Sequence, residues 1–519
     1  MSHELDPSGD QPGARRRFIE GLAAGATGGA LLSLTMKSSL ANAQALPTKF
    51  VTLKDFGAIG NGTTDDTSAV QNAIDSAASG NYQAIYVTAG TYKITDTITI
   101  RRGISLIGEG CEPYKDLGTS SRGNGSWFYL AHTKIGFNIR PDTQSPPPHD
   151  LSGFYMKSIG TIRNQPTPGG SAFTPTANDW DIYIANSDVF LEDLTLLNPT
   201  KGIYVTNAAA TPPNTLNPFS RVTIHNIRGQ PLTYGLVIDE TRDIARISDI
   251  HWWPFWTLNP NVNQWQIANL VGIQLARCDT PFISNVFSWA TRIGFKVIAN
   301  SAGTTTGIQL ANANFDNTHI GMYVDASSIG VTGQMTNVTT QGSSPYSPLN
   351  AGVQIEGSSC LLDFVNLSSS VFNTNAVLVN GNGNIVNISN FRSRNYDGSG
   401  AGYPALQVAS GNSAFVTGLS EISYVSTATW FGGSGNISCH LGSGTVSTTT
   451  DVSGFAGILP SPSLRCDPRK VFVQMTGTYT PALITVDMQT AGFIRTRFFT
   501  PSGTPMANTA VSFHWRAEY

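Results

Sequence analysis

A short motif recurs along the middle of the chain and constrains its fold more than any other feature. A Gly or Ala followed by apolar-x-apolar residues returns at steps of 22 to 37 residues, at Gly202, Gly235, Gly272, Gly294, Gly321, Gly352, Ala376 and Ala405. A second motif, an Asn or Asp set between apolar residues, follows 13 or 14 residues later in four of these repeats. This interleaving predicts a solenoid in which one strand-turn-strand unit repeats in every coil and extra residues leave as loops.

The second motif predicts a column of stacked side chains. Its members are Asp193, Asn226, Asp249, Asn285, Asn337, Asn366 and Asn390, with Asn314 as a less regular member. Because neighbouring parallel strands lie about 4.8 Å apart, equivalent Asn side chains in successive coils can hydrogen-bond to one another. We therefore interpret Asp249 as a structural carboxylate rather than a catalytic one.

Composition agrees with an all-β protein and excludes several classes. Charged residues make up 13% of the chain and hydrophobic residues 40%, with 52 Gly among 519 residues. A disordered chain has lower hydrophobicity and higher net charge, and a helical protein contains more Glu, Lys, Leu and Ala. The net charge of −3 comes with no basic cluster beyond the N-terminus, so no nucleic-acid partner is expected.

The first 45 residues have the layout of an export signal. Arg15, Arg16 and Arg17 precede Phe18 and an uncharged stretch that ends in small residues at 43–45. The paired arginines resemble the twin-arginine motif, which implies export of a folded protein from a bacterium to the periplasm or beyond. No later segment is long and apolar enough to span a membrane. We expect residues 1–45 to be a signal peptide.

The segment after the signal predicts a capping helix and several short strands. It reads as a helix over 67–78 capped by Asp65 or Asp66, with strands near 85–87, 98–100 and 104–107. The letters DFGAIGNGTTDDTSAVQNAIDSA, IYVTAGTYKITDTITI and ISLIGEG resemble the opening of the pectate-lyase-like superfamily, in its rhamnogalacturonase/epimerase-like branch. The resemblance implies a right-handed, single-stranded parallel β-helix, here over residues 46–430. Members of the superfamily include polysaccharide hydrolases, lyases, epimerases and phage tailspikes.

Residues 431–519 change in character. A Gly/Ser/Thr-rich stretch leads into alternating segments at 471–476, 484–488, 493–499 and 511–515, which predict a small antiparallel β domain. We expect this domain to cap the exposed end of the solenoid or, alternatively, to take part in trimerisation or glycan binding. Parallel β-helices often form trimers, so a homotrimer is a further expectation. Of the five cysteines, Cys439 and Cys466 are candidates for a disulfide, and no metal site is predicted.

The candidate chemistry lies in carboxylates, because no nucleotide-binding, zinc-protease or serine-hydrolase motif occurs. Asp239, Glu240 and Asp243 follow the Gly235 repeat, and Asp279 follows the next repeat at an equivalent position. Neighbouring coils would bring these groups together on one edge. Glycoside hydrolysis needs two such carboxyls, one as acid and one as base or nucleophile.

An aromatic segment follows directly. Three of the nine tryptophans, Trp252, Trp253 and Trp256, fall within five residues and are candidates for stacking on sugar rings. Arg242 and Arg277 are further candidates for substrate contacts. The alternatives are that the tryptophans pack the loop onto the solenoid and that the arginines pair with surface carboxylates.

A second carboxylate pair comes from the same register argument. Asp325 and Glu356 each lie four residues past their glycine and should be stacked neighbours. We therefore expect an exported enzyme that acts on a polysaccharide, most simply a glycoside hydrolase without a cofactor. The alternatives are a lyase or uronate epimerase, with Ca²⁺ as an option for a lyase, and a non-catalytic glycan-binding or tailspike-like adhesion protein. The motifs of polygalacturonases are missing from the coils.

Overall fold

The computed structural model describes residues 51–519 apart from 80–83, 102, 114–123, 141–152, 171, 186–187, 207–220, 242–243, 343–349, 425–429, 454, 459–469, 477–482 and 490–492. The predicted signal peptide, Arg242, Asp243 and Cys466 therefore lie outside the described residues. The disulfide prediction for Cys439 and Cys466 is not tested for the same reason.

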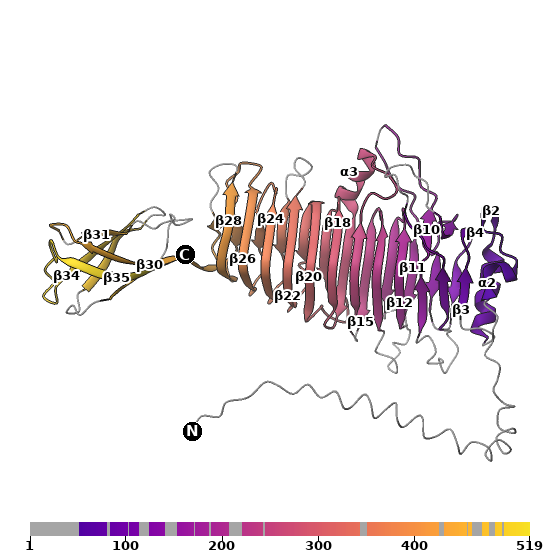
Figure 1. Ribbon diagram of the computed structural model, residues 1–519, viewed down its shortest axis with the longest axis horizontal. Helices are drawn as coiled ribbons and strands as arrows, with labels where there is room; N and C mark the ends of the chain where they lie inside the picture. The colour runs from indigo at the N-terminus through magenta and orange to yellow at the C-terminus, as the bar shows by residue number, and fades with distance from the viewer. Residues whose placement is uncertain are drawn as a thin grey trace, which may run out of the picture. The chain divides into compact units, whose positions relative to one another are not determined.

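The sequence repeats form the coils of a parallel β-helix, drawn in Figure 1 as arrows stacked side by side. One sheet has a single strand per coil: β5 (Ile98–Ile100), β8 (Phe137–Ile139), β11 (Trp180–Ala185), β13 (Lys201–Thr206), β15 (Tyr234–Thr241), β17 (Val271–Cys278), β19 (Ile293–Ile298), β21 (Ile320–Val324), β23 (Ala351–Ile355), β25 (Val377–Val379), β27 (Leu406–Val408) and β29 (Phe431–Gly432). We call it the second sheet. Neighbouring strands pair in parallel throughout.

The larger sheet is bent, and we call its two halves the first limb and the second limb. In the early coils the limbs are separate strands: β1 (Val51–Thr52), β3 (Ala84–Val87), β6 (Ser105–Gly108) and β9 (Phe154–Lys157) in the first, and β2 (Asn61–Asp65), β4 (Gly90–Ile94), β7 (Ser126–Leu130) and β10 (Gly160–Arg163) in the second. Later strands cross both limbs: β12 (Val189–Leu196), β14 (Val222–Gly229), β16 (Arg246–Trp252), β18 (Phe282–Trp289), β20 (Ile308–Thr318), β22 (Thr332–Gly342), β24 (Leu361–Ser370), β26 (Ile385–Tyr396) and β28 (Ser413–Tyr424). Strand β12 pairs with both β9 and β10, which is where the two limbs join.

The glycines of the first motif share one position on the inner face of the second sheet. The pairs around Gly235 and Gly272, Tyr234 with Val271 and Leu236 with Ile273, place these two glycines opposite each other. A Cβ atom on Gly235 would lie 2.5 Å from the carbonyl oxygen of Gly272 and 2.7 Å from Nε1 of Trp252. The motif is therefore a consequence of coil-on-coil packing, where no side chain fits.

The predicted Asn/Asp column lies at the corner between the two limbs. Its members have positive φ: Asp193, Asn226, Asp249, Asn285, Asn312, Asn337, Asn366 and Asn390. Asn390 donates to Asn366 at 2.8 Å, Asn366 to Asn337 at 2.8 Å and Asn337 to Asn312 at 3.0 Å. Asn is among the few residues other than Gly that adopt this left-handed conformation readily. The ladder is confirmed, but the assignment of Asn314 to it is wrong, because Asn312 occupies the corner.

Asp249 ends this ladder. Asn285 donates to Oδ1 of Asp249 at 3.2 Å, and the ring Nδ1 of His225 lies 3.2 Å from Oδ2. A carboxylate accepts hydrogen bonds but cannot donate one to the next residue, so the ladder of side-chain amides ends at Asp249. A shorter run continues beyond, where Asn226 donates to Asp193 at 3.1 Å. Asp249 thus has the structural role expected for it.

Helix α2 (Thr67–Ala78) has the predicted bounds, follows the short 3₁₀ helix η1 (Leu53–Phe56) and packs Val70, Ala73 and Ile74 into the core. The two carboxylates before the helix, Asp65 and Asp66, have different hydrogen-bond partners. Asp65 accepts from the backbone N–H of Thr67 at 3.0 Å. Asp66 occupies the N-cap position without a capping bond and accepts instead from the N–H groups of Ile59 and Gly60, at 2.7 and 3.0 Å.

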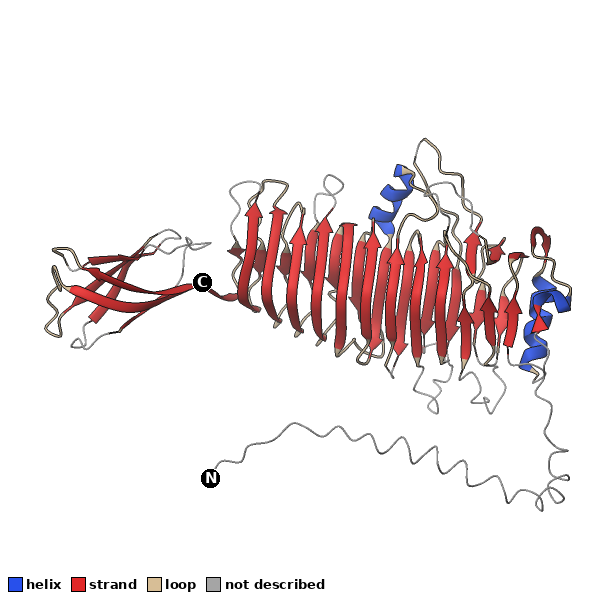
Figure 2. Ribbon diagram, viewed as in Figure 1, coloured by secondary structure: helices blue, strands red, loops and turns tan. Residues whose placement is uncertain are grey.

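Helix α3 (Pro260–Asn269) lies outside the coils, as Figure 2 shows in blue beside the strands. With the preceding loop it forms a satellite hydrophobic cluster on the outer face of the second limb, made of Cys111, Trp127, Phe173, Leu197, Leu232, Trp256 and Val262. This cluster covers part of the second limb in the early coils.

The C-terminal region forms small antiparallel sheets, as predicted. Strand β30 (Asn436–Thr449) pairs in parallel with β28 as far as Cys439 and then runs antiparallel to β35 (Ala510–Glu518), which also pairs with β32 (Lys470–Met475). Strands β31 (Phe455–Ile458), β33 (Leu483–Gln489) and β34 (Ile494–Phe499) form the other sheet. Their buried residues make a hydrophobic cluster of their own. The expected all-β parallel β-helix, with a capping helix and a C-terminal β domain, is confirmed.

Candidate functional site

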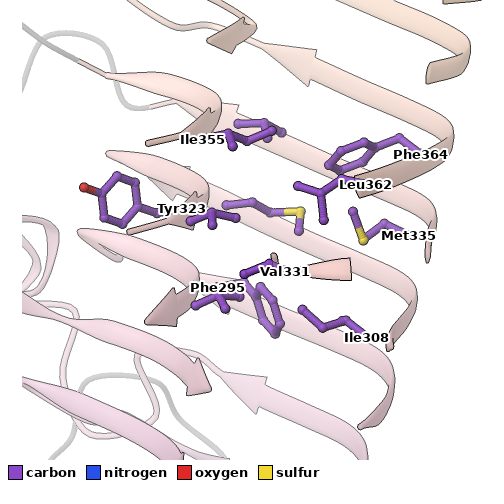
Figure 3. Close-up of a pocket in the computed structure, with 12 residues that line it drawn as sticks. Phe295, Ile308, Tyr323, Val331, Met335, Ile355, Leu362 and Phe364 are labelled. Atoms are coloured by element: carbon purple, nitrogen blue, oxygen red, sulfur yellow. The ribbon is translucent and has the colours of Figure 1, made fainter. Parts of the chain in front are cut away.

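The space enclosed by the described coils around residues 295–364 is too small for a ligand. An enclosed space of about 10 Å³ lies among apolar side chains that include Phe295, Ile308, Met335 and Phe364 (Figure 3). A water molecule needs about this much space and also several polar partners, which an apolar lining does not provide. In these coils a ligand therefore has room only at the outer faces.

The strand register of the second sheet shows where the predicted carboxylates lie relative to the next coil. Asp239 lies opposite Ala276 of the next coil, and Thr241 lies opposite Cys278. Asp239 is part of strand β15 rather than of the following turn. Asp279 comes three residues after Ala276, so its backbone is about 10 Å further along the coil. The two carboxylates share one edge without being stacked.

Asp239 is held by two donors from different coils. The phenol of Tyr204 donates to Oδ2 at 2.7 Å, and the amide of Asn300 donates to Oδ1 at 2.7 Å. Asn300 reaches Asp239 across the intervening coil, where the facing residue is the small Ala276. Burial raises the pKa of Tyr204, and its hydrogen bond to Asp239 raises it further. The carboxylate is thus fixed in position as an acceptor, with half-buried surroundings.

Glu240 and Arg277 occupy a strained corner next to Asp239. Both residues have left-handed backbone conformations, with φ of 61° and 49°, and the register places them opposite each other in adjacent coils. Arg277 Nη1 lies 2.8 Å from Oδ2 of Asp279. Left-handed residues other than Gly and Asn cost about 1 kcal/mol or more and concentrate at functional sites. The structure thus brings together Asp239, Glu240, Arg277 and Asp279, while Arg242 and Asp243 fall outside the described residues.

A row of aromatic rings leads up to this group, and sequence reasoning missed it. Trp180, Tyr183, Tyr204 and Tyr234 lie on the outer face of the second sheet and are half-buried. Tyr183 and Tyr204 stack with centroids 5.5 Å apart, and Trp180 lies 5.0 Å from Tyr204 and 5.7 Å from Tyr234. The signal was present in the sequence, because Tyr204 is the x of the apolar-x-apolar motif after Gly202 and such residues point outward.

The second carboxylate pair has the predicted register. Val324 pairs with Ile355, and Glu356 donates its N–H to the carbonyl of Val324, so Asp325 and Glu356 follow each other in adjacent coils. Each has a polar partner: Lys296 lies 3.8 Å from Asp325, and Asn380 donates to Glu356 at 2.9 Å. Burial acts to raise the pKa of Asp325, but hydrogen bonds from Ser327 and the charge of Lys296 lower it overall.

Of the three predicted tryptophans, only Trp253 is available to a surface ligand. Trp252 is 1% exposed and donates from Nε1 to the carbonyl of Gly272 at 3.1 Å inside the coils. Trp256 is 5% exposed and belongs to the satellite cluster under α3. The prediction of a sugar contact is therefore wrong for Trp252. Trp256 is nearly covered, although it is one of the residues, with Tyr129 and Gln165, that line a surface cleft of about 300 Å³.

Other candidate chemistry is limited in the part of the chain that the structure describes. No group of three or more His, Cys, Asp or Glu side chains is placed to hold a metal ion there. Burial raises the pKa of Cys111 and of Cys278 to about 11, so both thiols are unreactive. Neither described helix has the length and apolar composition of a membrane span.

Comparison with known proteins locates the resemblance at the start of the β-helix. Residues 50–135 match the family described as rhamnogalacturonase A/epimerase, pectate lyase-like. This match confirms the resemblance seen in the sequence for the first coils, and the stacked strands confirm the parallel β-helix that the resemblance implied.

Curated relatives match over short segments only. The chain is 37% identical over 65 residues to mannuronan C5-epimerase AlgE2 of Azotobacter vinelandii, which is 11% of this chain and 6% of that protein. It is 43% identical over 60 residues to a glucan 1,3-beta-glucosidase of Cochliobolus carbonum, which is 12% and 8% of the two chains. The chain thus spans less than a tenth of the length of these relatives.

Solved structures with a similar arrangement have low identity. The tailspike gp61 of Pseudomonas phage phi297 has a TM-score of 0.40 and 13% identity, covering 91% of this chain and 99% of that one. The family 28 exopolygalacturonase of Yersinia enterocolitica has a TM-score of 0.41 and 14% identity, covering 75% and 78%.

Proposed function

We propose that this pectate-lyase-like chain is an enzyme that acts on a polysaccharide at the outer face of the second sheet, with hydrolysis of a glycosidic bond as its reaction. The observation that carries the proposal is Asp239, a carboxylate fixed by Tyr204 and Asn300 at the end of a row of aromatic rings. The matched segments of the relatives belong to an epimerase of mannuronan and to a glucosidase of a glucan, and both names denote enzymes of polysaccharides.

The aromatic row suits a sugar chain. Pyranose rings present flat C–H faces that pack on aromatic rings, while their hydroxyl groups need polar partners at the edges. Trp180, Tyr183 and Tyr234 supply the rings in this proposal, and Lys201, 5.7 Å from the ring centroid of Trp180, supplies a donor. A chain bound along this row would reach Asp239 in the adjoining coil.

Asp239 acts as the ionised partner in the proposed reaction. Both of its oxygens accept hydrogen bonds, from Tyr204 and Asn300, and a carboxylate held as an acceptor suits a base that activates water. The proton donor is then Glu240 at the strained corner or Asp279 beside Arg277. Inverting glycosidases separate their carboxyls by about 6.5–9.5 Å to leave room for water. An offset of three residues and one coil puts the Asp239 and Asp279 backbones about 11 Å apart, so their side chains would have to lean toward each other to reach that range. Variants Glu240→Gln and Asp279→Asn distinguish the two donors.

A lyase or uronate epimerase is the second candidate, favoured by the Tyr204–Asp239 pair. Both reactions begin with removal of a proton next to a uronate carboxyl, and a phenol bonded to a carboxylate is able to take part in proton transfer. Arg277 would face the substrate carboxylate in that reaction. Ca²⁺ remains an option for a lyase, and neither reaction requires an organic cofactor.

The proposed setting is outside the bacterial cytoplasm. Residues 1–45 carry the twin-arginine layout, and a polysaccharide substrate would be met in the periplasm or beyond the cell. The test is the location and N-terminal residue of the protein after expression in a bacterium with and without a working twin-arginine pathway.

The function is tested by incubating the protein with a panel of soluble polysaccharides. New reducing ends without ultraviolet absorbance indicate hydrolysis, absorbance of an unsaturated uronate indicates a lyase, and an altered uronate ratio by NMR indicates an epimerase. Asp239→Asn should abolish turnover, while Asp363→Asn, which alters a carboxylate on the first limb, should retain it. Full activity in Asp239→Asn would move the site to Asp325 and Glu356, and binding without turnover across the panel would favour a glycan-binding protein.

A further inference from the structure

A second group of aromatic rings lies on a different face of the coils. His251, Trp253, Phe255, Phe287 and Trp289 form a connected patch on the outer side of the second limb, which we call the second-limb patch. His251 packs edge-on against Phe255 at 5.2 Å and Phe287 at 5.3 Å. Trp253 lies 5.7 Å from Phe287 and 5.6 Å from Trp289.

The register explains why these rings meet and face outward. His251 pairs with Phe287, and Trp252 pairs with Ser288 in the same two strands. Because side chains alternate along a strand, Trp252 and Ser288 point into the coil while Phe287 and Trp289 point out. The left-handed corner at Asn285 shifts this alternation, so the pattern could not be read through the whole strand from sequence.

The second-limb patch begins beyond the part of the second limb that α3 and its preceding loop cover. Phe255 also packs against the satellite cluster under α3, so this loop forms a wall at one end of the patch. Beyond it His251 is exposed, and Trp253, Phe287 and Trp289 remain half-buried rather than covered. Burial lowers the pKa of His251, and the charge of Arg228 lowers it further, which favours the neutral ring.

One carboxyl adjoins the patch in the next coil. Asp316 pairs with Trp289 across β18 and β20. Its side chain is half-buried, and the described residues place no Lys, Arg or His in an ion pair with it. Burial raises the pKa of Asp316, while a hydrogen bond from the backbone of Asn317 acts in the opposite direction. A partly buried carboxyl without a cation is unfavourable unless a ligand supplies donors.

We propose that the second-limb patch binds an uncharged stretch of a polysaccharide chain, with sugar rings packed on Trp253 and Trp289 and sugar hydroxyls donating to Asp316. An aromatic ring beside a carboxylate matches the two kinds of surface that a neutral sugar presents, its C–H face and its hydroxyl edge. A uronate would bring a second negative charge to Asp316 with no cation between them. The ligand class rests on the proposed function, but the patch lies on the second limb, apart from the second-sheet face around Asp239.

The test compares two aromatic residues of one strand. Trp289 and Phe282 lie at opposite ends of β18, on the second and first limbs, and Phe282 is 42% exposed. Binding of neutral gluco-oligosaccharides, β-1,3- and β-1,4-linked, and of mannuronate oligosaccharides is measured by titration calorimetry. We expect Trp289→Ala to weaken binding of a neutral oligosaccharide at least about tenfold, as loss of one stacked ring does, and Phe282→Ala to change it less than about twofold.

The titrations are run in the Asp239→Asn protein as well as in the unaltered chain, with thermal melting as a check on folding. Binding that survives Asp239→Asn and is lost in Trp289→Ala supports the patch, whatever the outcome for turnover. Equal affinities in Trp289→Ala and Phe282→Ala overturn it, as does tighter binding of mannuronate than of every neutral oligosaccharide. Loss of turnover in Asp239→Asn with no binding at Trp289 would leave the proposed function standing and remove this proposal alone.

Discussion

The phenol of Tyr204 donates a 2.7 Å hydrogen bond to Asp239, a residue of the following coil. Asn300 holds the other carboxylate oxygen from beyond the next strand. Three separate turns of the chain therefore fix one carboxylate, and none of the three residues is near the others in sequence. This arrangement gives Asp239 a defined position on the face that also carries the rings of Trp180, Tyr183 and Tyr234.

Replacing Tyr204 by Phe should lower kcat/KM by about 10- to 100-fold, because a hydrogen bond to a charged group contributes about 1.5–3 kcal/mol. The ring and its stacking on Tyr183 remain. Tyr323→Phe is the matched control, since Tyr323 faces outward on the same sheet beside Lys296 rather than beside Asp239. Equal rates in the two variants would show that the Tyr204 hydroxyl does not take part.

The buried pair of Arg163 and Asp181 should behave as a unit. Nε of Arg163 lies 2.7 Å from Oδ1 of Asp181, and both side chains are fully buried. Removing one partner leaves an uncompensated charge, so Arg163→Met or Asp181→Leu should each lower the free energy of unfolding by about 3–5 kcal/mol. The double variant should lose less than the sum of the two. Urea denaturation measures the three values, and simple additivity would argue against a coupled pair.

Variants at Asn337 of the Asn ladder should separate the effect of backbone strain on stability from the effect of side-chain hydrogen bonds. Asn337 has φ of 55° and bonds to both Asn312 and Asn366. Asn337→Gly loses the two bonds but tolerates the left-handed backbone, whereas Asn337→Ala also bears a strain of about 1–2 kcal/mol. We expect melting temperatures in the order wild type, Gly, Ala. Gln334→Ala, at an exposed position on the same strand, is the control and should change stability by less than about 0.5 kcal/mol.

Asp316 should make stability depend on pH with a defined sign. Burial raises its pKa in the folded protein above 3.8, so the folded state disfavours the charged form. This penalty is absent below pH 3.8 and develops as pH rises through the folded pKa. Asp316→Asn should therefore raise the melting temperature at pH 7 and have little effect near pH 3. A lower melting temperature at pH 7 would indicate that the carboxylate has a stabilising partner.

Much of the fold was predictable because its determinants are local and repeated. The glycine column appears in sequence since no Cβ fits where successive coils touch, as at Gly235. The corner residues appear because only a few residue types adopt the left-handed conformation. One corner was misassigned: Asn312 and Asn314 both sit among small and apolar residues, and only stacking between Asn285 and Asn337 selects Asn312.

The candidate site was predictable only in part. The repeat register predicted that Asp279 follows Gly272 much as Asp243 follows Gly235, and it also placed Asp239 in the turn, whereas Asp239 lies in strand β15. The donors to Asp239 were not predictable, because both belong to other coils and Asn300 reaches Asp239 across the coil of Ala276.

The sequence by itself determined that the chain stacks as coils and which residues form their inner column and corners, because those positions repeat with the coil. Only the tertiary structure decided which side chains of the aromatic segment are buried and which face outward. Trp252 fills the space left by Gly235 and bonds to Gly272, while Trp253 faces outward to meet Phe287 and Trp289 from the next coil. Neighbouring tryptophans in one sequence look alike, and only the pairing of strands across coils assigns one to the core and one to the surface.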